Sequence, residues 1–193
     1  MRAILLTLSL TLLITVLLQG CAPVVVGGAA TGASVIHDRR SAGTTLDDRT
    51  IELKILNKLT QDKRLSDHSG ISVNSYNHVV LLSGQAETAE YRNQAAAAAA
   101  GTAMVKRVVN EIQIAPSSSI SEDAKDSWIT SKAKLELFEI KLPGFDPTRV
   151  KITTQRGVVY LMGRVTQQEA DAAVEKIRFL RGVKQVVKVF EYI

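Results

Sequence analysis

Cys21 is the only cysteine of the chain, and the residues before it predict covalent modification of its thiol. An almost unbroken apolar run, residues 3–18, follows the positive charge of Arg2. A run of this length is typical of a secretory signal peptide and is short for a transmembrane helix. Gly20 directly precedes the cysteine, and Leu18 stands two places before that glycine, which is the pattern of a lipoprotein cleavage site. We therefore expect cleavage after Gly20, a diacylglycerol on the Cys21 sulfur and an acyl chain on its amine.

The apolar run has a second interpretation, in which it stays uncleaved as an anchor and Cys21 lies near the membrane surface. In either case a single thiol cannot form an intramolecular disulfide. Ala22 follows the cysteine at a place where Asp commonly signals retention in the inner membrane, so we expect an outer-membrane location facing the periplasm. Residues 22–45 are rich in small residues and have no sustained period, so residues 21–45 are predicted to be a lipidated cysteine and a flexible tether.

Other residues that could do chemistry do not form a recognisable site. The three histidines, His37, His68 and His78, lack the spacing of metal ligands. The sequence contains no G-x-S-x-G motif, no phosphate-binding loop and no convincing pair of carboxylates. We therefore expect neither catalysis, nor a metal, nor a cofactor beyond the lipid on Cys21. The net charge of +5 could suit a nucleic acid, but an exported protein rarely meets one, so no nucleic-acid partner is predicted.

Two copies of one unit make up the rest of the chain, because similar runs recur at an offset of 78 or 79 residues. The matching pairs are residues 51–55 and 129–133, 79–84 and 158–163, and 105–109 and 183–187. A Ser-rich stretch between the copies has the composition of a polar linker. The predicted organisation is a signal peptide (1–20), the tether (21–45), a first domain (46–114), the linker (115–124) and a second domain (125–193).

Each copy predicts the element order helix, strand, strand, helix, strand. The expected helices are 47–60, 88–100, 126–139 and 167–180; the expected strands are 71–75, 79–83, 108–114, 150–154, 158–162 and 186–193, with hairpin turns at 77–78 and 156–157. A three-stranded mixed sheet packed on two helices is the simplest way to bury the apolar faces, with a right-handed crossover to the last strand. The predicted fold class is therefore α+β, as a tandem repeat of two such domains.

Short-range patterns support these elements. Asp47 and Asp126 stand at the start of the two first helices and are the expected N-caps. Thr166, with Glu169 three places later, forms a capping box at the start of the last helix. The alanine run 95–100 is a strong helix former with little side-chain bulk, so we expect its helix to lie close to its sheet.

Several runs in this pattern resemble the BON-domain family. They are the glycine after each second strand (Gly84 and Gly163), the start of the last strand at 182–186, and the runs 126–132 and 159–163. The last two runs are similar in particular to the second domain of two-BON-domain outer-membrane lipoproteins associated with cell division and envelope stress. That resemblance implies a periplasmic module that associates with phospholipid and supports outer-membrane integrity. The first copy departs from the pattern before its last strand, where no glycine directly precedes Met104-Val105.

Positive charge is concentrated in the second copy. Residues 46–114 contain eight Lys or Arg and eight Asp or Glu, whereas residues 125–193 contain 13 Lys or Arg and eight Asp or Glu. An anionic bilayer attracts such a surface by about 1 kcal/mol for each well-placed Lys or Arg. A basic surface that is merely solvated would give the same count, and that alternative stays open.

The first helix of the second copy is predicted to carry an apolar stripe that points away from its core. At about 100° per residue, its core face is made of four residues: Ile129, Ala133, Leu137 and Ile140. Trp128 and Leu135 share a different face, with Phe138 at its edge, although Phe138 could also join the core. The counterparts in the first copy are all polar: Thr50, Asn57 and Thr60. Three lysines lie on or beside the stripe: Lys132, Lys125 and Lys134.

A tryptophan beside lysines on an exposed helix face is typical of a helix at a membrane interface. We therefore expect this stripe and its lysines to bind an anionic phospholipid membrane, as a second attachment beside the lipid on Cys21. In one alternative, Trp128 and Leu135 are buried between the two copies, each of which has a small core. In another, the stripe and the basic surface bind an envelope or outer-membrane assembly protein, and the chain is a protein–protein adaptor.

Overall fold

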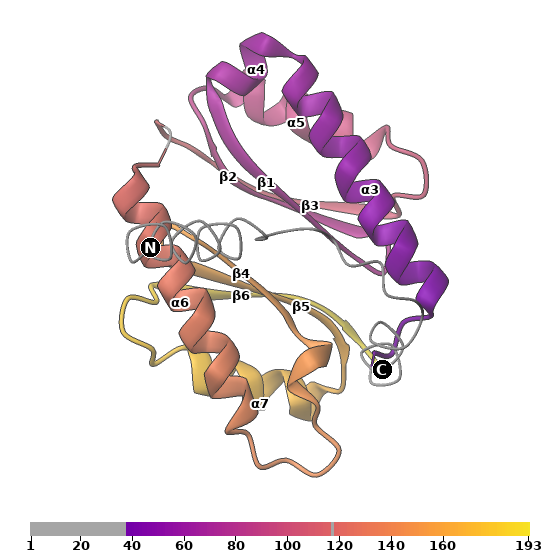
Figure 1. Ribbon diagram of the computed structural model, residues 1–193, viewed down its shortest axis with the longest axis vertical. Coiled ribbons are helices and arrows are strands. Elements are labelled where there is room, and N and C mark those ends of the chain that lie inside the picture. The colour runs from indigo at the N-terminus through magenta and orange to yellow at the C-terminus, as the bar shows by residue number, and fades with distance from the viewer. Residues whose placement is uncertain (1–37, 117) are drawn as a thin grey trace, which may run out of the picture. The chain divides into compact units, whose positions relative to one another are not determined.

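The computed structural model describes residues 38–116 and 118–193 (Figure 1). The predicted signal peptide, Cys21, His37 and most of the predicted tether lie outside these residues. The last residues of the predicted tether are helical, because the first described helix, α3 (Ala42–Gln61), begins at Ala42. The expectation of a flexible segment as far as residue 45 is therefore wrong for residues 42–45.

The first domain is a three-stranded sheet with its helices on one face (Figure 1). Its elements are α3, α4 (Lys63–Asp67), β1 (Ser69–Tyr76), β2 (Val79–Ala86), α5 (Ala89–Ala100) and β3 (Arg107–Ile114). The central strand β2 is antiparallel to β1 and parallel to β3. Ile51 of α3 and Ala99 of α5 are fully buried in one cluster with Leu82 of β2. The alanines of α5 therefore lie close to the sheet, as expected.

The second domain repeats this arrangement. Its elements are α6 (Ile120–Phe138), the 3-10 helix η1 (Pro147–Arg149), β4 (Lys151–Gln155), β5 (Val158–Val165), α7 (Gln167–Ile177) and β6 (Gln185–Tyr192). The central strand β5 is antiparallel to β4 and parallel to β6. The predicted core face of α6 is buried against the sheet, with Ile140 partly buried beside it. The predicted α+β class, with two mixed three-stranded sheets packed on helices, is confirmed.

Both first helices begin earlier than expected, because serines outside the predicted domains cap them. Ser41 caps α3 by accepting a hydrogen bond from the backbone N–H of Thr44. Ser119 caps α6, and Glu122 completes a capping box with it. Residues 120–124 of the predicted linker are therefore helical. The predicted capping box of α7, which Thr166 forms with its third neighbour, is confirmed.

Asp126, predicted as an N-cap, lies inside α6 and binds the hairpin turn instead. Its carboxylate accepts hydrogen bonds from the two backbone N–H groups of turn 156–157, at 2.5 and 2.8 Å. In the first domain Asp48, rather than Asp47, accepts the equivalent bonds from turn 77–78, both at 2.8 Å. All four turn residues have positive φ, between 51° and 80°, as a type I′ hairpin turn requires. Both predicted hairpins are confirmed, whereas the prediction that Asp47 and Asp126 are N-caps is wrong.

Gly84 and Gly163 lie within the second strands rather than after them, because β2 and β5 are longer than predicted. A Cβ atom at Gly84 would collide with the backbone carbonyl of Gly70. A Cβ atom at Gly163 would collide with the backbone carbonyl of Arg149. Both glycines therefore allow a neighbouring backbone segment to approach the strand closely.

A third apolar cluster joins the two domains. It contains Tyr76 and Leu81 of the first domain, with Val158, Tyr160, Met162 and Val189 of the second. Because successive side chains of a strand point to opposite faces, Leu81 lies on the face of β2 that the helices leave uncovered. Both faces of β2 and β5 are therefore covered, which explains why nearly every residue of these two strands is buried.

Candidate functional site

The apolar stripe that the sequence predicts on α6 is exposed. Trp128, Leu135 and Phe138 expose 47%, 60% and 67% of their surface, so Phe138 does not join the core. Ile129, which follows Trp128 and lies about 100° around the helix, is buried. Ile120 is also exposed at the start of the helix and lengthens the stripe. We refer to Ile120, Trp128, Leu135 and Phe138 as the outer stripe.

The alternative in which Trp128 and Leu135 are buried between the two copies is wrong. The domains meet through the open faces of their sheets, where Leu81 and Tyr160 belong to the shared cluster. Neither Trp128 nor Leu135 belongs to it. The outer stripe therefore has no covering element among the residues that the structure describes.

The three predicted lysines accompany the outer stripe. Lys125, Lys132 and Lys134 are all exposed. Within residues 38–116 and 118–193, none of them lies within ion-pair distance of a carboxylate. Their ammonium groups are therefore available for contact with an anionic surface. No helix of the described residues is long and apolar enough to cross a membrane.

Sequence reasoning missed a second apolar stripe, on α3. Leu46, Leu53 and Leu56 are exposed there. A position-by-position comparison of the copies overlooked them. They lie four residues, about one helical turn, before the counterparts of Trp128, Leu135 and Phe138 in the first copy. It contains no aromatic residue and lies beside the ion pair of Arg49 with Glu52, at 3.1 Å. The outer stripe of α6 is therefore distinguished by its aromatic residues and by the three exposed lysines beside it, not by exposed apolar surface alone.

A cavity of about 540 Å³ lies beside Trp128, between the first half of α6, the hairpin turn 156–157 and the loop from α7 to β6. Four basic residues contribute to its lining: Lys125, Arg156, Arg181 and Lys184. Sequence reasoning identified only the first of these, because the other three are distant from Trp128 along the chain. The signal that could have found them is the excess of positive charge in the second copy.

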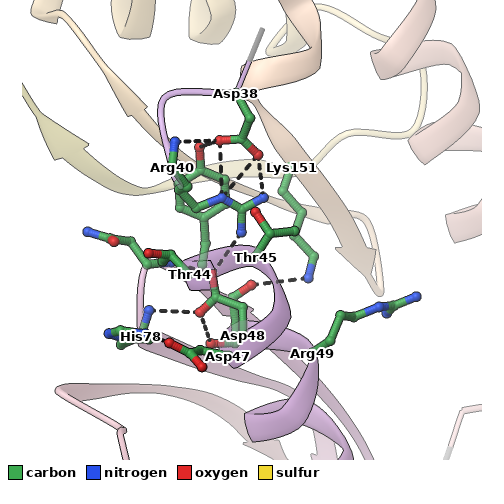
Figure 2. Close-up of polar contacts among 12 residues, drawn as sticks. Asp38, Arg40, Thr44, Thr45, Asp47, Asp48, Arg49, His78 and Lys151 are labelled. Carbon is green, nitrogen blue, oxygen red and sulfur yellow. Dashed lines mark hydrogen bonds and ion pairs between the residues drawn. The ribbon is translucent and has the colours of Figure 1, made fainter. Parts of the chain in front are cut away.

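A polar cluster at the start of α3 ties the segment before this helix to α3 and β1 (Figure 2). Its residues Arg40, Asp48 and Tyr76 also line a cavity of about 540 Å³. Arg40 pairs with Asp38 at 2.7 Å and with Asp48 at 2.8 Å, and its guanidinium lies 3.8 Å from the centre of the Tyr76 ring. Burial raises the pKa of Asp38, but the hydrogen bonds and charge of Arg40 outweigh burial and hold that pKa below its ordinary value. In the described part of the chain, no group of His, Cys, Asp or Glu could hold a metal ion.

Comparison with known proteins identifies the repeated unit. The BON-domain profile matches residues 47–116 and 125–193, which correspond to the two domains of the structure. The chain is 38% identical over 182 residues to the outer membrane lipoprotein DolP of Haemophilus influenzae, which covers 93% of this chain and 92% of that protein. It is 38% identical over 159 residues to a 21 kDa hemolysin of Actinobacillus pleuropneumoniae, covering 81% and 79%. It is 30% identical over 159 residues to osmotically-inducible protein Y of Escherichia coli, covering 80% and 77%.

The matched residues coincide with the two copies predicted from the sequence. Each copy forms one of the two three-stranded sheets. The chain therefore belongs to the BON-domain family and contains two BON domains.

Proposed function

We propose that this chain is a lipoprotein of the outer membrane that faces the periplasm, is acylated at Cys21 and binds anionic phospholipid through α6. Its similarity to the outer membrane lipoprotein DolP supports the location, because the alignment spans 93% of this chain. The apolar run before Cys21 supports the acylation. We also propose that the protein has no catalytic activity and acts by supporting outer-membrane integrity.

The observation that carries the lipid proposal is the outer stripe with the three exposed lysines beside it. Burial of Trp128, Leu135 and Phe138 in lipid would contribute about 1.5–3 kcal/mol each as an upper bound. Each lysine near an anionic surface would add about 1 kcal/mol. The indole N–H of the tryptophan can hydrogen-bond in the wet interfacial layer. An acyl chain on Cys21 would make this contact intramolecular and therefore effective even where α6 alone binds weakly.

A Cys21→Ala variant, which cannot be acylated, isolates the contribution of α6. Trp128 is the only tryptophan of the chain, so tryptophan emission, excited selectively over the four tyrosines, reports on the surroundings of this residue. We expect a blue shift of the emission when this variant meets vesicles of phosphatidylglycerol and phosphatidylcholine at low salt. Vesicles of phosphatidylcholine alone should give little shift. Added salt should weaken the response, because it screens the lysines.

Substitutions in the same background locate the contact. Trp128→Glu and Leu135→Glu should each abolish co-sedimentation with the anionic vesicles, because they place a charge in the apolar contact. Leu53→Glu on α3 is the matched control, since Leu53 is exposed to a similar degree. It should bind as the parent does, and far-UV circular dichroism should be unchanged in all three variants.

Two outcomes would contradict the proposal. Equal loss of binding in Leu53→Glu would mean that the contact is not specific to α6. Absence of vesicle binding by the parent at low salt would reject the lipid surface as the partner. The second outcome would favour the adaptor alternative, in which the outer stripe binds an envelope or outer-membrane assembly protein.

A further inference from the structure

The cavity beside Trp128 has the composition of an anion-binding site. Its volume is about 540 Å³, and four basic side chains line it: Lys125, Arg156, Arg181 and Lys184. The hairpin turn and the loop before β6 are held together there, because the backbone N–H of Lys184 donates to the carbonyl of Gly157 at 2.8 Å. The cavity is therefore a feature of the folded second domain and draws its residues from three separate segments.

The two carboxylates in the lining, Asp126 and Glu122, offset only part of the charge of these four cations. Asp126 is buried, and both of its oxygens accept backbone hydrogen bonds from the hairpin turn. Glu122 belongs to the capping box of α6 and forms an ion pair with Arg156 at 3.5 Å. The other three basic residues form no ion pair within residues 38–116 and 118–193. The cavity consequently carries uncompensated positive charge.

The first domain has the same backbone framework without this chemistry. At the positions of Lys125, Trp128, Arg156 and Arg181 it has Asp47, Thr50, Asn77 and Ala103. Lys184 alone has a basic counterpart, Lys106, whose backbone N–H donates to the carbonyl of His78 at 2.9 Å. Three cations and an indole therefore distinguish the second domain at a place where the two backbones agree.

On the basis of the proposed function, we infer that this cavity binds the phosphate of an anionic phospholipid headgroup while the outer stripe enters the acyl layer. Trp128 lines the cavity and also belongs to the outer stripe, which places the amphipathic indole at the boundary between the two layers. Guanidinium and ammonium groups are the donors that phosphate oxygens accept best. The ammonium of a zwitterionic headgroup would be repelled by the same cations. A lipid with an uncharged headgroup alcohol, of the phosphatidylglycerol class, therefore fits the cavity.

Paired substitutions separate the cavity from the outer stripe. Arg181→Gln with Lys184→Gln removes two cations of the cavity, whereas Lys106→Gln with Arg107→Gln removes two exposed cations of the first domain. Tryptophan fluorescence of each pair, in the variant that cannot be acylated, is titrated with phosphatidylglycerol–phosphatidylcholine vesicles and with monomeric dihexanoyl-phosphatidylglycerol. Affinity should fall about fivefold for each cavity cation removed, or roughly 25-fold for the pair. The control pair should change it by less than about twofold on the soluble lipid.

Four further results of these titrations would each support or overturn the assignment of the cavity to a lipid phosphate. If the cavity pair binds both probes as the parent does, while Leu135→Glu does not, the outer stripe binds lipid and the cavity inference is wrong. If the parent binds neither probe, the inference and the proposed function both fail. Displacement of the soluble lipid by an equal concentration of inorganic phosphate would show a general anion site and overturn the lipid assignment. Lys184→Arg keeps the charge and should keep the affinity; a loss as large as that of Lys184→Gln would assign the effect to local packing and overturn the inference.

Discussion

Gly182 and Met104 occupy the same place in the two domains, at the turn before the last strand. Both have positive φ, 92° for Gly182 and 72° for Met104. Glycine adopts this conformation without steric cost, whereas a residue with a Cβ atom is strained by about 1–2 kcal/mol. In the second domain a Cβ at this place would also lie 3.1 Å from Cδ1 of Ile129. The first copy therefore departs from the family pattern because it has a strained methionine at the place where the second copy has an unstrained glycine.

Alanine at each of these two positions tests this explanation. Gly182→Ala should lower the free energy of unfolding by about 1–2 kcal/mol, because it adds both the strain and the contact with Ile129. Met104→Ala keeps the positive φ and shortens a side chain that is already exposed, so the change should stay within about 0.5 kcal/mol. Urea unfolding followed by circular dichroism measures both variants. If both variants lost the same free energy of unfolding, the explanation that Met104 is already strained and Gly182 is not would be contradicted.

At the scale of the elements, a buried aspartate ties each first helix to the hairpin of its own domain. Asp48 of α3 and Asp126 of α6 each accept two backbone hydrogen bonds from a turn whose residues have positive φ. The N–H groups of such a turn are strong donors that must find a partner once they are buried. In the second domain this bond also positions the turn 156–157, which forms one wall of the cavity.

Asp126→Asn is expected to lower the free energy of unfolding by about 2–3 kcal/mol. The amide group would turn one acceptor into a donor that faces a backbone donor, and a charged hydrogen bond would be lost. Asp171→Asn is the matched control, because Asp171 is exposed on α7, where it accepts hydrogen bonds from the side chain of Gln167 and forms a long ion pair with Lys188 at 3.9 Å. Its effect should be about 0.5 kcal/mol or less. Comparable losses of stability in the two variants, measured by urea unfolding, would show that Asp126 does not hold the turn.

The element order could be predicted from the sequence because the repeat presents each pattern twice. The helix starts could not, since the Ser-rich composition around Ser119 favoured a linker. Yet the spacing of Ser119 and Glu122 is that of a capping box, and this local bond outweighs composition. Helical periodicity likewise placed Trp128 on the outer face, one residue before the core residue Ile129. Helical periodicity could not predict that Lys184 lies beside Trp128, because the two residues come close only when β6 pairs with β5.

At the scale of the whole molecule, the domains are joined through their central strands β2 and β5, and this leaves the outer stripe exposed. The runs 79–82 and 158–162 are continuously apolar rather than alternating, which is typical of strands covered on both faces. The helices of each domain cover only one face, and the shared cluster around Leu81 and Tyr160 covers the other. The open faces of both sheets are thus used in joining the domains. The outer face of α6 takes no part in that contact and is available to another partner.

A short segment before α3 adds a charged link between the domains. Arg39 donates to both carboxylate oxygens of Glu169, at 2.6 and 2.9 Å, and to the carbonyl of Arg164 at 2.9 Å. Burial raises the pKa of Glu169, but hydrogen bonds from Arg39 and Thr166 outweigh it and hold the pKa below the ordinary value of 4.5. A carboxyl group with a depressed pKa in the folded state stabilises the fold above its unfolded pKa. This contribution is lost as the pH falls through the folded pKa.

Arg39→Ala should therefore lower the free energy of unfolding by about 2 kcal/mol at neutral pH, because Glu169 loses its pair with Arg39 at 2.6 Å and keeps the longer pair with Arg149 at 3.7 Å. The difference from the parent should shrink as the pH falls through the depressed pKa of Glu169 in the parent, which lies below 4.5, because the carboxyl group is then protonated in both proteins. Arg178→Ala is the control, since Arg178 is exposed, pairs with Glu175 at 3.5 Å and lies 4.5 Å from the centre of the exposed Phe179 ring. It should cost about 0–1 kcal/mol at any pH. Urea unfolding across a pH series measures both variants, and a constant difference for Arg39→Ala would mean that Arg39 joins the domains by packing rather than by charge.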